Sequence, residues 1–96
     1  MTKNDKKVYL QGHITVPSDR LDEVRRALPT HITLTRAEEG CIAFEVSEDD
    51  AHPGRFNVSE VFSNQAAFDA HQDRTRNSDW FRITQGIPRA YSVSSE

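Results

Sequence analysis

Apolar and polar residues alternate along four short segments of the chain, which predicts four β-strands. Successive side chains of an extended chain point to opposite faces, so an apolar residue at every second position indicates a strand with one buried face. In the third segment Phe56, Val58 and Phe62 share a face, and Glu60 falls in register among them. A carboxyl group therefore interrupts an apolar face. The predicted strands are residues 8–16, 41–47, 55–62 and 89–93.

The first helix is predicted from an entry signal at residues 17–19 and from apolar residues at helical spacing after it. Pro29 removes one backbone hydrogen bond, and residues 30–35 are mostly β-branched and nearly alternating, so a strand is the local alternative there. Against this, Ile32 continues the helical spacing and Gly40 stands where a helix terminator is expected. We therefore predict one long helix that is kinked near Pro29.

The second helix is predicted over residues 65–76, with Ser63 or Asn64 as its cap. A short oxygen-bearing side chain at that position accepts a hydrogen bond from one of the free amides of the first turn. Phe68 and His71 are three residues apart, and a rotation of about 300° places them on the same helix face. If Phe68 packs on the sheet, His71 does so too.

The predicted order is strand, helix, strand, strand, helix, strand, with a short extra helix after a capping signal at residues 77–79. This order is typical of a ferredoxin-like βαββαβ domain of the α+β class, with a four-stranded antiparallel sheet and both helices on one face. The other face would be too apolar to be left in water, so we predict a homodimer packed sheet to sheet. The residues expected there are Tyr9, His13, Cys41, Ala43, Val61, Tyr91 and Val93.

Length, charge and composition narrow the class of protein. The 96 residues suffice for a single domain, expected over residues 8–94 after a disordered tail at residues 1–7. The net charge of −3 offers no electrostatic case for nucleic-acid binding. No apolar run approaches the roughly 20 residues that span a bilayer, and no signal peptide is recognisable. With Cys41 as the single cysteine, we expect a cytoplasmic protein that has no membrane or nucleic-acid partner.

Gly12 interrupts the apolar row of the first predicted strand. Glycine inside a strand often marks a place where another group comes close. A tight helix crossing is the simpler explanation, and room for a ligand is the functional one.

His71 and Glu60 are the candidate functional residues, because both are predicted to point into the gap between the sheet and the helices. Burial in such a gap shifts the protonation of both groups. Each also has a structural explanation. His71 would be a core or interface histidine, and Glu60 would be half of an ion pair with Arg89 or Arg55.

The run EEGCIAFEV, the turn DDAHPGRF, the strand SEVFSN and the helix start AAFDAH occur in this order along the chain. Together they resemble the antibiotic biosynthesis monooxygenase domain family, and most of all its small quinol-oxidising members. The resemblance extends from Val8 to Val93. It implies a small ferredoxin-like protein that forms a dimeric α+β barrel.

The resemblance also implies an oxidation without flavin, metal or nicotinamide, so no cofactor is expected. Family oxygenases bind a phenol or quinol between sheet and helices, help to remove its proton, and let the anion pass an electron to oxygen. By this likeness the partners are a small aromatic substrate and oxygen. His71 would be the catalytic base, and Glu60 would set its tautomer or hold a substrate hydroxyl. The residues expected to line the pocket are Gly12, Phe44, Phe62, Phe68, Trp80 and Phe81.

Two other functions remain open at this point. One is a noncatalytic small-molecule-binding or accessory dimer of the same fold. The other is an isomerase of a small oxygenated carbonyl compound, as in some relatives with the alanine-histidine pair; it requires polar and basic groups near the cavity, and the sequence indicates few. Heme degradation is not expected. Heme-degrading relatives use an asparagine, a tryptophan and a histidine, and at the corresponding positions this chain has Gly12, His71 and Gln85 instead.

Overall fold

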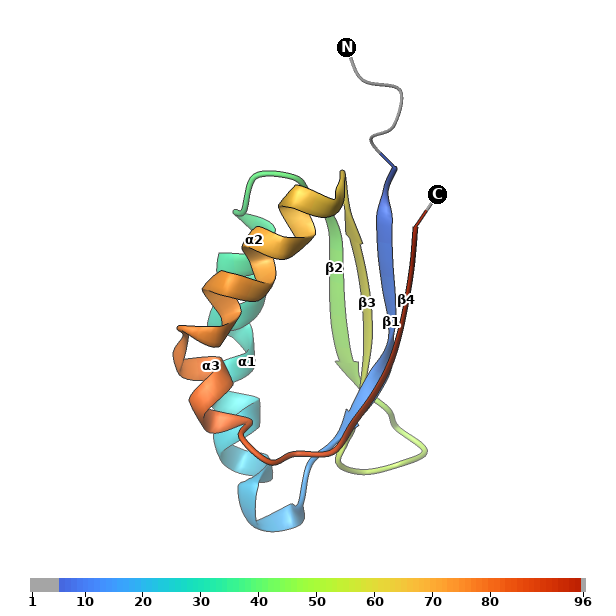
Figure 1. Ribbon diagram of the computed structural model, residues 1–96. Helices are drawn as coiled ribbons and strands as arrows, with labels where there is room; N and C mark the ends of the chain where they lie inside the picture. The colour runs from blue at the N-terminus through green and yellow to red at the C-terminus, as the bar shows by residue number, and fades with distance from the viewer. Residues whose placement is uncertain (1–5, 96) are drawn as a thin grey trace.

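The computed structural model describes residues 6–95, which form a four-stranded antiparallel sheet with all helices on one face (Figure 1). The strands lie in the order β2-β3-β1-β4, so the ferredoxin-like α+β fold predicted from the sequence is confirmed. Most of the predicted disordered tail, residues 1–5, lies outside the described part. The elements are β1 (Val8–Thr15), a single 3₁₀ turn (Ser18–Arg20), α1 (Leu21–Arg36), β2 (Cys41–Glu48), β3 (Arg55–Phe62), α2 (Gln65–Arg76), α3 (Asp79–Ile83) and β4 (Arg89–Ser95).

Helix α1 continues through Pro29, as predicted, and no strand forms at residues 30–35. Its buried residues are Val24, His31 and Thr35, whose spacing places them on one helical face. Leu34, which a strand would place on the same face as Ile32, is instead 48% exposed. Packing of one helical face against the sheet therefore outweighs both the local β-propensity and the proline.

Helix α2 begins where its cap predicts. The Asn64 side chain accepts a hydrogen bond from the Ala67 amide at 2.8 Å, and Phe68 and His71 are the buried residues of the helix. Helix α3 follows a second cap, in which the Ser78 hydroxyl accepts from the Phe81 amide at 3.3 Å. Among the described helices, none combines the length and apolarity that a membrane crossing requires.

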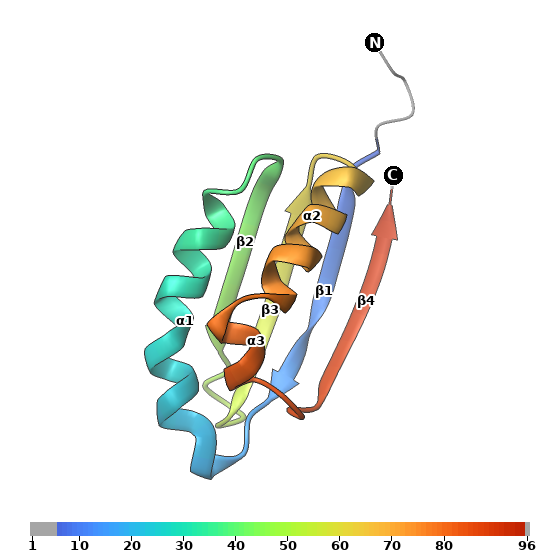
Figure 2. The ribbon, with the colours of Figure 1, turned by 60° about the vertical axis from the view of Figure 1, so that its left-hand side comes forward.

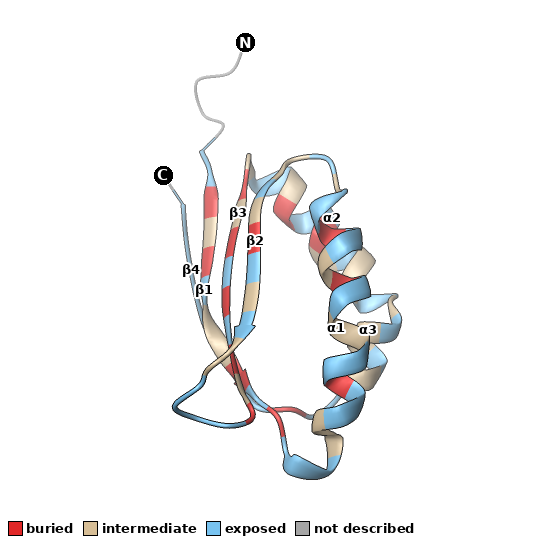
Figure 3. Cartoon of the chain, turned by 180° about the vertical axis from the view of Figure 1, so that it is seen from behind, coloured by how far each residue is buried: buried red, intermediate tan, exposed pale blue. Residues whose placement is uncertain are grey.

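The helices leave one strand of the sheet uncovered. Helix α1 packs on β2 and α2 packs on β3, whereas β4 lies beside β1 at the open edge (Figure 2). Every residue of β4 is exposed, whereas β1 and β3 both contain several buried residues (Figure 3). Two apolar clusters form between the layers, one around Phe62 and Phe68 and the other around Val24 and Phe56.

Two residues of β4 that were predicted on the outer face lie on the helix-facing side instead. Tyr91 pairs with Gly12, and Val93 pairs with the buried Leu10. Residues directly opposite each other in an antiparallel pair share a face, so the outer-face prediction was wrong for Tyr91 and Val93. They remain exposed because no helix covers β4.

Cys41 was also predicted on the outer face, and a bulge in β2 places it on the helix-facing side instead. The register shifts between Cys41 and Ala43, so that Cys41 pairs with the buried Phe62 and packs against the first apolar cluster. Ile42 is left 52% exposed. One extra residue in a strand reverses the alternation beyond it, and a strictly alternating pattern predicts the wrong face for Cys41.

Gly12 makes room for β4 and not for a helix. A Cβ atom at this position would lie 1.9 Å from the carbonyl oxygen of Ala90 and 2.8 Å from the Tyr91 ring. The Tyr91 ring therefore lies directly over Gly12. The first of the two expectations for Gly12 was right about close packing and wrong about the element that packs.

We expect Gly12→Ala to lower the free energy of unfolding by roughly 3 kcal/mol, because the new methyl group forces β4 away from β1. Gly86→Ala is the matched control. Gly86 has a φ of +76° but no atom within 4 Å of an added Cβ, so only about 1 kcal/mol is lost there. Urea unfolding followed by circular dichroism measures both. Equal losses in the two variants would contradict the close approach.

Candidate functional site

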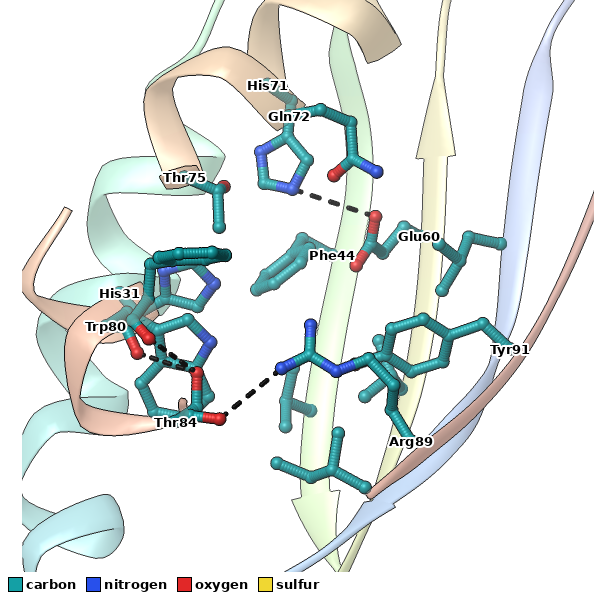
Figure 4. A pocket seen from close by; sticks show the side chains of 15 residues that line it. His31, Phe44, Glu60, His71, Gln72, Thr75, Trp80, Thr84, Arg89 and Tyr91 are labelled. Carbon is teal, nitrogen blue, oxygen red and sulfur yellow. Dashed lines mark hydrogen bonds and ion pairs between the residues drawn. The ribbon is translucent and has the colours of Figure 1, made fainter. Parts of the chain in front are cut away.

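A cavity of about 220 Å³ lies between the sheet and the helices (Figure 4). Its sheet-side wall consists mainly of apolar side chains of β1, β2 and β3 that belong to or pack against both apolar clusters. Its helix-side wall carries His31 of α1, His71 of α2, and Trp80 and Phe81 of α3. Gln72, Thr75 and Thr84 on the helix side, with Arg89 and Tyr91 of the uncovered strand β4, complete the lining. The cavity therefore combines apolar walls with several convergent polar groups, and such a combination occurs in small-molecule sites.

His71 is held in one orientation by a carboxylate and an aromatic ring. Its Nδ1 lies 2.9 Å from Oε1 of Glu38, and its ring stacks on Phe62 with centroids 4.8 Å apart. Because a carboxylate can only accept, the hydrogen must be on Nδ1, and Nε2 keeps its lone pair. Nε2 is 3.8 Å from Oε1 of Glu60, so the basic nitrogen faces the Glu60 side chain.

Glu38 is in turn held by Arg74 of α2, which is itself anchored to α1. Arg74 donates from Nε to Oε2 of Glu38, and its NH2 group donates to the Thr35 hydroxyl at 3.0 Å. The Glu38 side chain is 15% exposed, in contrast to 3% for His71. An Arg–Glu–His network thus links the outer surface of the helices to the cavity.

Burial changes the proton affinities of both acid–base groups that face each other. Desolvation, reinforced by the charge of Glu38, raises the pKa of Glu60 to about 7. Desolvation lowers the pKa of His71, although the Glu38 carboxylate opposes this shift. Near neutral pH the imidazole is therefore neutral and Glu60 is about half protonated. Titratable groups shifted in this way gather at functional sites more often than elsewhere.

Three buried polar atoms find no hydrogen-bond partner in the described chain, and all three belong to residues that line this cavity. They are Nδ1 of His31, Oε1 of Glu60 and Oγ1 of Thr75. An unpaired buried polar atom costs about 1–3 kcal/mol. Native proteins contain few such atoms, and those that occur often have a functional role. These three atoms are therefore candidates for ligand contacts.

His31 is held as a neutral ring among aromatic neighbours. It stacks on Trp80 with centroids 4.7 Å apart and meets the edge of Phe44 at 5.5 Å. Desolvation, together with the charge of Arg74, lowers the pKa of His31 to about 3. His31 therefore presents a neutral imidazole edge to the cavity.

The structure brings together five of the eight residues expected at the site. Glu60, His71, Phe44, Trp80 and Phe81 line the cavity. The other three do not line it. Phe62 stacks behind His71, Phe68 packs on Phe62 at 5.8 Å, and Gly12 lies beneath Tyr91.

Four site residues escaped the sequence analysis, namely His31, Glu38, Thr75 and Arg89. The two alternatives for residues 30–35 disagree about the face of His31, and only the helical spacing places it inward. Glu38 lies 33 positions from His71, and no local pattern indicates that contact.

The alternative role of Glu60, an ion pair with an arginine, was wrong, since no arginine of the described chain forms an ion pair with it. Among residues 6–95, no group of three histidine, cysteine or acidic side chains is placed to hold a metal ion.

We expect the Glu60→Gln variant to become more stable than the wild type as the pH rises. The pKa of Glu60 increases from 4.5 to about 7 on folding, so the folded state retains the proton more strongly. The wild type therefore loses stability from pH 4.5 to pH 7, whereas glutamine cannot ionise. Between pH 4 and pH 8 the difference in unfolding free energy should grow by ~3 kcal/mol.

Urea unfolding of both proteins at pH 4, 6 and 8 measures this difference. Glu23→Gln on the exposed side of α1 is the control for the loss of one carboxylate. A difference that stays constant with pH would show that Glu60 is not desolvated in the folded protein.

Comparison with known proteins places this chain in a family. A 67-residue stretch, 70% of the chain, is 34% identical to an uncharacterised protein of Synechocystis, and the chain spans about half (46%) of that relative's length. A structure from Nitrosomonas europaea superposes with a TM-score of 0.83 at 15% identity, covering 100% of this chain and 95% of the other. One from Deinococcus radiodurans gives 0.75 at 22% identity, covering 93% and 89%.

At these identities the two structures establish the fold, and the family follows from the sequence itself. Residues 7–82 match the sequence profile of antibiotic biosynthesis monooxygenases. The matched part includes every element from β1 to α2 and most of α3. The chain therefore belongs to the antibiotic biosynthesis monooxygenase family.

Proposed function

We propose that this protein is a cofactor-independent oxidase or monooxygenase of a small phenol or quinol that binds between the sheet and the helices. The observation that carries this proposal is the buried His71, whose Nδ1 is held by Glu38 while Nε2 faces an aromatic-lined cavity. An engineered cavity of about 150 Å³ in another protein accommodates benzene. The 220 Å³ found here suits one substituted ring.

In this proposal His71 removes the proton of a substrate hydroxyl. The hydroxyl donates to Nε2, and the imidazolium that forms is stabilised by the Glu38 carboxylate on the other side of the ring. Glu60, in its protonated form, donates a hydrogen bond to the developing oxyanion. The raised pKa of Glu60, about 7, keeps a protonated fraction available near neutral pH.

The deprotonated ring then passes electrons to oxygen. A quinol gives up two electrons and two protons, and oxygen becomes hydrogen peroxide while the ring becomes a quinone. A phenol with a free para position instead receives one oxygen atom at that carbon and becomes a para-quinone; the hydroxyl hydrogen and the para hydrogen leave with the other oxygen atom as water. Neither reaction requires an external reductant, so the acid–base groups of the cavity are the only catalytic groups that the protein must supply.

The proton has a route away from the cavity. His71 also borders an open pocket on the other side of α2, together with Glu38, Arg74 and Gly40. A proton accepted at Nε2 can be balanced by loss of the Nδ1 proton toward Glu38, which is in contact with solvent. Glu38 thus positions His71 and also connects it to the outside.

We expect the wild type to consume oxygen with at least one member of a hydroquinone and phenol panel, and His71→Ala to lower kcat by at least about 100-fold, the usual contribution of a general base. An oxygen electrode, with peroxide detection and circular dichroism in parallel, makes the measurement. His52→Ala is the matched control, because the His52 side chain is 61% exposed in the β2–β3 turn.

Turnover by His71→Ala at the wild-type rate would refute the role of His71. Saturable binding of the whole panel without oxygen uptake would instead identify a noncatalytic binding protein.

A second candidate function is an isomerase of a small oxygenated carbonyl compound. The sequence indicated too few polar groups for it, but the cavity lining includes His31, Thr75 and Arg89 in addition to His71 and Glu60. A neutral base facing a protonated carboxyl group suits proton transfer between two carbon atoms. The oxygen electrode separates the two functions, since an isomerase converts its substrate under anaerobic conditions.

We further propose that the outer face of the sheet forms a homodimer. Tyr9, Ala43 and Val61 of this face are half-buried without any helix against them, and family membership supports such an assembly. Sedimentation equilibrium should give a dimer at micromolar concentration. Val61→Glu should shift the equilibrium to monomers, whereas Leu34→Glu on the helix surface should not. A wild-type monomer would contradict the assembly.

A further inference from the structure

Arg89 brings a positive charge to the cavity from the strand that no helix covers. It is the first residue of β4, and its guanidinium group points from the sheet edge into the cavity (Figure 4). Its hydrogen bond to the carbonyl oxygen of Thr84 is long, at 3.5 Å. Within residues 6–95 no carboxylate lies in ion-pair distance of Arg89, in contrast to Arg25, Arg36 and Arg74. The cation is thus free to bind an anion.

The other ionisable groups that face the cavity do not cancel this charge. Desolvation lowers the pKa of His31 to about 3 and also lowers that of His71, so both rings are neutral near pH 7. Desolvation raises the pKa of Glu60 to about 7, so this carboxyl group is increasingly protonated below that pH. In slightly acidic solution Glu60 is mostly protonated, so Arg89 is then the main charge among the lining side chains and the lining is positive on balance.

Two sets of polar atoms suit the two ends of a single ligand, in addition to the unpartnered atoms of His31 and Thr75 on the helix side of the cavity. Nε2 of His71 and the unpartnered Oε1 of Glu60 face each other at 3.8 Å. Arg89 enters from β4, on the side opposite the α2 backbone that carries His71 (Figure 4). Aromatic and aliphatic side chains form much of the remaining wall, together with Gln72, Thr75 and Thr84. A ligand that satisfies both ends must carry a hydroxyl at one end of a planar ring and an anionic group at the other.

We infer that the cavity binds a hydroxylated aromatic acid, whose carboxylate pairs with Arg89 while its ring hydroxyl faces His71 and Glu60. Arginine suits this role because its planar guanidinium group binds a carboxylate through two parallel hydrogen bonds. The inference rests on the proposed function for the aromatic ring and its hydroxyl. It does not require turnover, so binding tests it separately.

Isothermal titration calorimetry at pH 6.5 with three probes tests the inference. The probes are 2,5-dihydroxybenzoate, its methyl ester and unsubstituted hydroquinone. The ester keeps the ring and both hydroxyls and replaces the charged carboxylate by a neutral group that is one methyl larger. We expect the acid to bind at least about 10-fold more tightly than the ester, as a charge-assisted hydrogen bond predicts. The preference should shrink as salt is added, because Arg89 is exposed at the cavity mouth.

Substitution then assigns the preference to one side chain. Arg89→Met should bind acid and ester equally, and Arg89→Lys should retain part of the preference. Arg82→Met is the matched control, because Arg82 lies on the exposed side of α3, pairs with Asp79 and does not line the cavity. Quenching of Trp80, the single tryptophan of the chain, gives a second binding signal from within the cavity.

Three results would overturn the inference. They are a wild type that binds the acid no more tightly than the ester, no measurable binding of the acid, and a full preference in Arg89→Met. The first two need no variant, so the inference stays testable even if Arg89→Met fails to fold. Oxygen uptake with hydroquinone but without preference for the acid would leave the proposed oxidation standing. Tight binding of the acid without oxygen uptake would support the inference about the ligand and contradict the proposed oxidation.

Discussion

The hydrogen bond between Nδ1 of His71 and Glu38 is the interaction on which the site depends. A histidine that is 3% exposed must satisfy its ring nitrogens inside the protein or lose stability. Glu38 satisfies Nδ1 and selects the tautomer, so the lone pair of Nε2 is directed toward Glu60. Desolvation lowers the pKa of His71, and the charge of Arg74, which pairs with Glu38, adds to that shift, so the buried imidazole remains neutral beside a carboxylate. Without this network His71 would be free to turn, and its basic nitrogen would have no defined direction.

The space between sheet and helices combines close packing with polar groups that the protein leaves unpaired. Phe62 and Phe68 pack as closely as in an ordinary core, with centroids 5.8 Å apart. In the same space between the layers, His31, Glu60 and Thr75 each bury a polar atom without a partner. A sequence selected for stability alone would place apolar residues at such positions, because an unpartnered polar atom weakens the fold. The contrast between the two regions separates a binding site from a packed core.

Several features of the fold were predictable because they depend on neighbours in sequence. The Asn64 cap, the helical spacing of α1 across Pro29 and the inward face of Glu60 each follow from residues within about one or two helical turns, or from a period of two. The same local rules placed His71 on the inner face of α2. The order of these elements then implied the sheet topology, since few arrangements connect them without crossing.

The sequence by itself determined which elements form, which face of β1, β3 and α2 is buried, and that a histidine and a glutamate share the interior. Only the tertiary structure decided the register of Cys41, the contact of Tyr91 with Gly12, and the approach of Glu38 and Arg89 to the site. Those features depend on a one-residue bulge or on pairs of residues far apart along the chain. A periodic pattern describes one element at a time, whereas these contacts exist only after separate elements have packed together.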